Sequence, residues 1–118
     1  MADDIAPTGI LADRLRLGVG VAGDERAGII ERLQPLERRL ASFRPETVDL
    51  ELSAKERDRA DQRVTLECWI AGEQRLVSTS RRERFDDALL EVRDDMIRRV
   101  NDAVTRREPR NNRRLRQR

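Results

Sequence analysis

A glycine-rich run at residues 18–23 is the segment of this chain whose spacing most resembles a ligand-binding motif. It has the form G-x-G-x-x-G, follows an alternating apolar segment and precedes a helical pattern. In that context such a run binds the pyrophosphate of a dinucleotide. However, Asp24 and Glu25 follow directly, and they place carboxylates where the phosphate meets the helix N-terminus. We therefore interpret the run as a glycine-rich strand end that enters a helix, and we predict no cofactor.

Basic side chains are the second group that could bind a ligand, because their N–H groups neutralise phosphates and donate hydrogen bonds to them. Residues 106–118 contain seven arginines and one acid, a net charge of +6, whereas the whole chain carries only +2. This tail is typical of a solvated, disordered arm or of an arm that binds a polyanion. The candidate RNA-binding residues are Arg38, Arg39, Lys55, Arg81, Arg82, Arg84, Arg98, Arg99, Arg106, Arg107, Arg110, Arg113 and Arg114.

Acidic neighbours offer an alternative interpretation for several of these cations. Acids alternate with bases along residues 55–61, which favours a solvated connection over a binding site. Near the C-terminus, acids precede arginines by four residues, a spacing typical of ion pairs on an exposed helix. Phosphate binding there requires breaking or sharing those pairs. The pairs are Asp94 with Arg98, Asp95 with Arg99 and Asp102 with Arg106.

Residue types that commonly catalyse reactions are scarce. The chain has no histidine and a single cysteine, Cys68, which excludes the commonest general base, an internal disulfide and a multi-cysteine metal site. Its carboxylates are spread over exposed helix positions, and their spacing brings no pair together. We predict no enzymatic activity, no metal, no cofactor and no small-molecule substrate, and we interpret Cys68 as a small core residue.

Hydrophobic spacing predicts an α+β fold of order β-α-β-β-β-α. Strands are expected at about residues 14–21, 48–52, 64–70 and 74–79. The first helix is expected to begin at Asp24 and to kink or restart at Pro35; the second, to begin with a capping box at Ser80 and to end at Pro109. Each helix has one apolar stripe and each strand one apolar face, so both helices should pack on one face of a four-stranded sheet. The opposite face, with Trp69, stays open to solvent.

The length of 118 residues is that of a single domain. We expect a flexible leader at residues 1–12, a folded domain at 13–108 and a disordered arginine-rich tail at 109–118. Asp3 and Asp4 lie in the leader and no segment has about 20 consecutive apolar residues, so we predict neither a signal peptide nor a membrane span. The expected protein is cytoplasmic and monomeric.

Four segments share element order, spacing and residue class with one known family. They are Leu36–Phe43, Val48–Ser53 with Lys55, Val64–Glu67 with the turn at Gly72, and Phe85–Val100. Together they resemble the ribosome hibernation-promoting factors, also called the ribosome-associated inhibitor or S30AE family, over about residues 14–104. Leu36–Phe43 is similar to the end of that family's first helix, and Val48–Ser53 with Lys55 is similar to its second strand and connection.

The resemblance implies a fold like that of a double-stranded-RNA-binding domain, in the short form without the family's dimerising domain. It also implies binding to the small ribosomal subunit and its 16S rRNA, in the channel used by messenger and transfer RNA, under stress or in stationary phase. The family's last helix is dense with cations, whereas this chain has Asp95 and Asp102 on that face. The alternative is a divergent domain of the same fold that binds proteins and carries a nonspecific basic tail.

Overall fold

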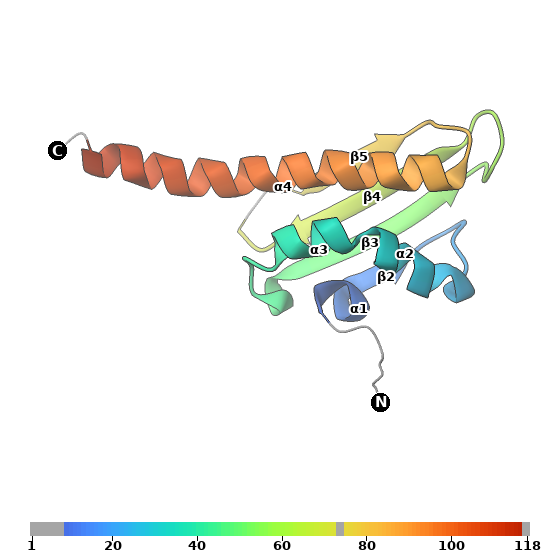
Figure 1. The fold of residues 1–118 in the computed structure, drawn as a ribbon, viewed down its shortest axis with the longest axis horizontal. Coiled ribbons are helices and arrows are strands. Elements are labelled where there is room, and N and C mark those ends of the chain that lie inside the picture. Colours follow the sequence, from blue (N-terminus) through green and yellow to red (C-terminus); the bar gives the residue numbers. More distant parts are fainter. Residues whose placement is uncertain (1–8, 73–74, 117–118) are drawn as a thin grey trace.

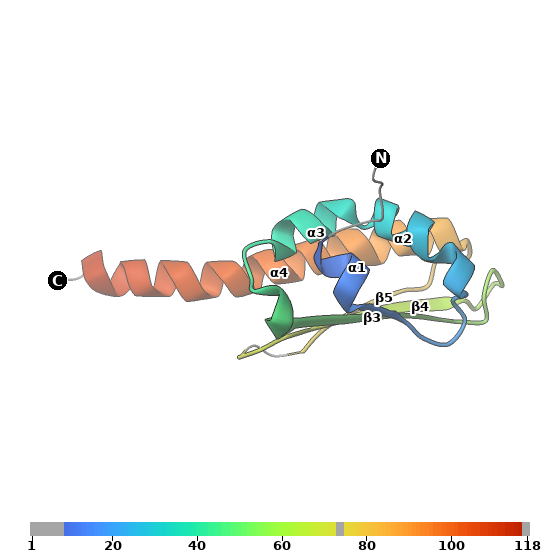
Figure 2. The ribbon, with the colours of Figure 1, turned by 90° about the horizontal axis from the view of Figure 1, so that it is seen from below.

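The structure is a computed structural model that describes residues 9–72 and 75–116, with residues 106–116 described by their helical backbone alone. Within these residues a four-stranded sheet is covered by helices on one face only (Figures 1 and 2), which confirms the predicted α+β class. The strands are β2 (Leu15–Leu17), β3 (Val48–Lys55), β4 (Arg63–Ile70) and β5 (Leu76–Ser80). The helices are α1 (Ile10–Arg14), α2 (Arg26–Arg32), α3 (Gln34–Leu40) and α4 (Phe85–Arg116), with 3-10 turns η1 (Gly23–Glu25) and η2 (Pro45–Thr47). No described helix is long and apolar enough to cross a membrane.

The sheet is mixed, in the order β2-β3-β4-β5. The first pair, β2 with β3, is parallel, and the other two pairs are antiparallel. A parallel pair needs a crossover connection, and here the crossover carries α2 and α3 over one face of the sheet. Helix α4 lies beside α3 on the same face (Figure 2).

Strict alternation along β3 and β4 produces the core. Every second residue of each strand is buried, and Leu50 lies opposite Cys68 while Leu52 lies opposite Leu66. The helices contribute matching apolar stripes, including Leu33, Leu36 and Leu40 and, from α4, Leu89, Val92, Met96 and Val100. Cys68 is a small core residue, as predicted, and burial raises the pKa of its thiol to about 12.

Pro35 divides the first predicted helix, as expected. Helix α2 ends at Arg32 and α3 restarts at Gln34, with Pro35 in its first turn. Proline has no backbone N–H to donate, so it suits a first turn and interrupts a helix interior. Leu33, at the junction, is fully buried. The break therefore lets the crossover follow the sheet while keeping its apolar residues in the core.

The N-terminal part of the domain differs from the prediction. Residues 10–12, expected in a flexible leader, belong to α1, whose Ile10 and Leu11 are buried. Arg26 holds this short helix by donating hydrogen bonds to the carbonyl oxygens of Leu11, Ala12 and Leu15. A five-residue helix has too little periodicity to be recognised. Residues 1–8 lie outside the described residues.

The first strand is shorter than predicted because the chain turns at Gly20. Strand β2 ends at Leu17, and Val19, expected on the apolar face, is 68% exposed. The backbone still follows β3: Gly18 N donates to Leu52 O at 2.7 Å and Ala54 N donates to Val19 O at 2.9 Å. Gly20 has φ +83°, and a Cβ there would lie 1.9 Å from Ala54 O. The glycines of the G-x-G run thus allow two backbones to approach closely, with no ligand required.

Both predicted ends of the last helix are wrong. Ser80 pairs with Val64 as the last residue of β5, and α4 begins only at Phe85. The cap comes from another element, because Phe85 N donates to Asp58 Oδ1 at 3.1 Å. At its other end α4 continues past Pro109 to Arg116 and projects beyond the sheet (Figure 1). The segment expected as a disordered tail is therefore largely helical backbone.

We predict that Gly20→Ala destabilises the domain by about 2 kcal/mol or more, because it forces an alanine to positive φ and into the Ala54 carbonyl. Urea unfolding measures the change. Gly23→Ala is the matched control from the same glycine run: a Cβ there meets no atom within 4 Å, and we expect a change of about 0.5 kcal/mol or less. Equal effects of the two substitutions would contradict this explanation of the run.

Candidate nucleic-acid interface

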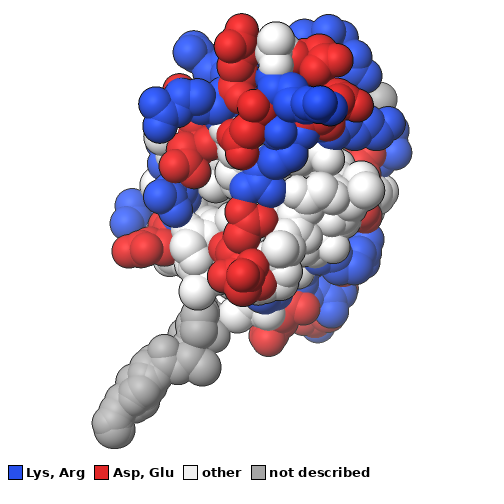
Figure 3. All heavy atoms as spheres, turned by 90° about the vertical axis from the view of Figure 1, so that its right-hand side faces the viewer, with Lys and Arg blue, Asp and Glu red and all other residues white. Residues whose placement is uncertain are grey.

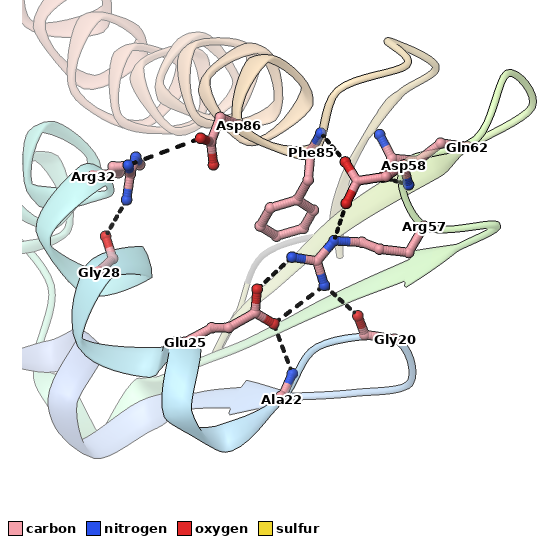
Figure 4. Close-up of polar contacts among 10 residues, drawn as sticks. All are labelled: Gly20, Ala22, Glu25, Gly28, Arg32, Arg57, Asp58, Gln62, Phe85 and Asp86. Carbon is pink, nitrogen blue, oxygen red and sulfur yellow. Dashed lines mark hydrogen bonds and ion pairs between the residues drawn. The ribbon is translucent and has the colours of Figure 1, made fainter.

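Arg57 connects the β3–β4 hairpin to the glycine turn and η1 (Figure 4). Its guanidinium donates to Gly20 O at 2.7 Å and to both carboxylate oxygens of Glu25. The hydrogen bond from Arg57, followed by that from Ala22 N, lowers the pKa of Glu25 below its usual value. The Glu25 carboxylate that argued against a dinucleotide thus bonds to Arg57 and Ala22, and belongs to a structural ion pair.

The same hairpin also organises the start of α4. Arg57 lies over the Phe85 ring, with its guanidinium carbon 3.7 Å from the ring centroid. Asp58 caps Phe85, while the buried Gln62 side chain accepts from Asp58 N and donates to Arg82 O at 2.8 Å. Glu56 and Asp58 have positive φ, which shapes the tight loop that these bonds hold. The hairpin therefore has a fixed position relative to α4.

The prediction of a solvated connection at residues 55–61 is only partly confirmed. Most of its residues are exposed, including Lys55 at the end of β3, but the Arg57 side chain is only 28% exposed. Hydrogen bonds from this hairpin bring it beside the β5–α4 loop. Lys55 and the exposed Arg81, Arg82 and Arg84 therefore share one end of the molecule. Arg82 turns toward α4, where its Nε lies 3.4 Å from a Glu91 carboxylate oxygen.

Positive charge at this end is mixed with negative charge. Figure 3 looks onto it and shows Lys and Arg atoms interspersed with those of Asp and Glu. Glu83, Asp86 and Asp87 are exposed near the three loop arginines. The backbone amide of Phe85, at the start of α4, already donates to Asp58 and is therefore not free to bind a phosphate. This surface is not uniformly basic.

Arg38 and Arg39 lie at a second location, in the last turn of α3 and away from the hairpin. Both side chains are exposed. With Pro35 and with Ile97 of α4 they line an open groove of about 390 Å³. Two cations above an apolar floor could contact an RNA backbone, but they lie on α3, away from Lys55 and the arginines of the β5–α4 loop.

Arg98 and Arg99 are held by one acid, Asp95. The carboxylate accepts from Arg98 Nη2 at 2.9 Å and from Arg99 Nε at 2.8 Å. Partial burial alone would raise the pKa of Asp95, but hydrogen bonds, first from Arg99, outweigh it and lower the pKa to about 2. The predicted pair with Arg99 is thus confirmed. The predicted pair of Asp94 with Arg98 is wrong, since Asp94 accepts instead from Arg93.

The remaining candidates lie on the projecting part of α4. Arg106, Arg107, Arg110, Arg113 and Arg114 belong to its helical backbone, and their side chains are outside the described residues. The predicted pair of Asp102 with Arg106 is outside them too. At 3.6 residues per turn, positions 106, 110 and 113 fall on one side of a helix axis. A continuous helix therefore spaces these cations regularly.

Trp69 lies on the open face of the sheet, as predicted. It alternates with buried neighbours along β4 and is half-buried. The guanidinium carbon of Arg16, on β2, is 5.6 Å from its ring centroid. Arg16 also forms ion pairs with Asp49 and Glu51. These interactions stabilise the tryptophan on the sheet, where the guanidinium of Arg16 lies over one face of its ring.

Two residues outside the list of candidate RNA-binding residues also matter here. The importance of Arg57 arises from partners more than 30 positions away in the sequence, so no local pattern could identify it. Arg63, exposed at the start of β4, lies directly opposite Lys55. Alternation predicts its outward direction, but only the strand register reveals the neighbouring cation.

No protein-family model matches the chain, and no curated protein sequence matches it significantly. A function for this chain therefore rests on its fold, its charge distribution and the resemblance of its segments.

We predict that Arg57→Gln destabilises the domain by about 2 kcal/mol, since it removes charged hydrogen bonds to Glu25 and the contact with Phe85. Urea unfolding at neutral pH measures the loss. Because the pKa of Glu25 is lowered in the folded state, its contribution is complete above about pH 4.5 and disappears as the pH falls below that value. The difference in free energy of unfolding between wild type and variant should therefore become smaller below about pH 4.5.

Arg59→Gln is the control for this prediction. Arg59 lies in the same hairpin, its side chain is 72% exposed, and among the described residues its one ion-pair partner is Glu56. We expect a change of about 0.5 kcal/mol or less. A loss for Arg59→Gln as large as that for Arg57→Gln would mean that hairpin charge in general, and not the Arg57 contacts, stabilises the fold.

Replacing Asp95 should release two arginines for phosphate binding. We predict that Asp95→Asn strengthens RNA binding severalfold at low salt and steepens its salt dependence, measured by fluorescence anisotropy with a labelled oligonucleotide. Asp94→Asn is the control, because it changes the charge equally but frees Arg93, which still donates to Arg32 O. Equal gains for both variants would show that only net charge matters.

Proposed function

We propose that this chain binds the small ribosomal subunit and inhibits translation by occupying its decoding channel. The sheet topology carries the proposal: a parallel first pair, two antiparallel pairs and all helices on one face. This is the β-α-β-β-β-α arrangement that the resemblance to the hibernation factors implies. The resembling segments also occupy corresponding elements, namely the end of α3, β3, β4 and the first half of α4.

Occupancy requires a rigid body and cations that reach RNA. The domain supplies the first through its continuous core and the Arg57 junction. Helix α4 supports the requirement for cations that reach RNA. Its 32 residues extend about 48 Å, and its arginine-rich end projects beyond the sheet (Figure 1). Residues 106–118 would then contact 16S rRNA phosphates while the body determines where the protein binds.

The acidic pairing on α4 favours a second candidate function, a protein-interaction domain with a nonspecific basic arm. Asp95 occupies both Arg98 and Arg99, so the described half of α4 presents few unpaired cations. In that case the body would recognise a protein, and the arm would add affinity for any nearby RNA. The two functions differ in whether the body discriminates the ribosomal subunit from other RNA.

A chain that ends at Thr105 separates the two functions. We predict that it still binds small subunits near one per subunit, with at least tenfold lower affinity and a weaker dependence on salt, because the arm's phosphate contacts are lost. Co-sedimentation with subunits through sucrose across a salt series measures this, alongside translation in vitro. Full-length binding that any competitor RNA abolishes, or loss of all binding on truncation, would contradict the proposed function.

A further inference from the structure

The register of the sheet arranges the residues of its open face in rows across the strands. Lys55 of β3 lies directly opposite Arg63 of β4. The pairing of Val64 with Ser80 places Arg81, the residue after β5, next in line beyond Arg63. Ser80 is buried and donates to Glu91 of α4, so continuing the strand alternation by one residue past β5 directs the exposed Arg81 to the open face. Three cations thus follow one another across about 10 Å.

This row of three cations lowers the stability of the folded state. Like charges directly opposite each other in an antiparallel pair are destabilising. Elsewhere on the open face the chain compensates for such pairs: Glu51 lies opposite Glu67, but Arg16 pairs with Glu51 and Arg75 pairs with Glu67. Among the described residues, by contrast, none of the three cations of the row has a carboxylate within ion-pair distance. Glu56, the nearest acid along the hairpin, pairs with Arg59.

The adjacent row suits the same ligand. Ser53, Thr65 and Thr79 lie beside the cations on β3, β4 and β5, and the Thr65 and Thr79 hydroxyls are 3.4 Å apart. Hydroxyl groups donate hydrogen bonds to phosphate oxygens and repel neither sugars nor phosphates. Among the described residues no helix covers this side of the sheet (Figure 2), so an extended ligand can reach both rows.

We propose that the open sheet face binds the sugar–phosphate backbone of single-stranded RNA, with Lys55, Arg63 and Arg81 on successive phosphates and the hydroxyl row beside them. This contact surface is separate from α4 and its arm. For the identity of its ligand the proposal rests on the proposed function, and it adds a specific face with which the body would contact RNA.

Lys55 offers a direct test because it is the only lysine of the chain. In the full chain, a saturating short uridine oligonucleotide should slow acetylation of the Lys55 amine at least fivefold, measured by peptide mass spectrometry. The N-terminal amine provides the internal reference. Unchanged reactivity of Lys55 while RNA is bound would overturn the proposal, and so would protection by polyglutamate but not by RNA, since that assigns the row to an acidic protein.

The triple variant Lys55→Gln, Arg63→Gln, Arg81→Gln should bind the oligonucleotide at least tenfold more weakly, with the logarithmic salt slope reduced by about 2 for three lost phosphate contacts. Arg44→Gln, Arg59→Gln, Arg75→Gln is the matched control, because each of its arginines is exposed and already paired with an acid. Equal losses for the two triple variants would overturn the proposal. The melting temperature of the row variant should not fall, since a repulsion is removed.

Ribosome binding is scored separately by co-sedimentation. Protection of Lys55 by RNA without subunit binding would leave the sheet-face site standing and contradict the proposed function. Subunit binding in which Lys55 remains fully reactive would support the proposed function and contradict the sheet-face site.

Discussion

The single apolar face of the sheet is the constraint on which the rest of this structure depends. Strands β3 and β4 bury alternate residues on one side only, so the helices must cover that side of the sheet. The parallel pairing of β2 with β3 places the crossover helices there, and α4 completes the layer. In the part of the chain that the structure describes, the opposite side is free of helices, so its side chains are available to a partner.

A second level of organisation is polar and joins parts of the chain that are distant in sequence. Arg57 brings the hairpin, the glycine turn, η1 and the first residue of α4 together through one guanidinium. Asp58 and Gln62 extend the same junction to the loop before α4. Since these contacts fix the hairpin end, they also fix the positions of Lys55 and the loop arginines, on which any RNA contact at this end depends.

The positions of the charged side chains on this protein are more informative than its net charge. Asp95 neutralises the arginines in the middle of α4, whereas the arginine-rich end of that helix projects away from the acidic body. On the open sheet face, ion pairs cover most charges but not the row that begins at Lys55. A net charge of +2 conceals these differences. We therefore expect polyanions to bind at the row that begins at Lys55 and at the arginine-rich end of α4.

The sequence by itself determined the order of the four strands and of the two main helical segments, the core faces of β3 and β4, the break at Pro35 and the outward direction of Trp69. These follow from spacing and from the chemistry of single residues, which act locally. Tertiary structure alone decided where α4 begins, because its cap comes from Asp58, 27 residues earlier. It also decided that the G-x-G run accommodates the Ala54 carbonyl, and that Lys55 meets Arg63. Each of these features depends on a contact between segments that are distant in the sequence. The periodicity of one segment does not reveal which distant segment it contacts in the folded protein.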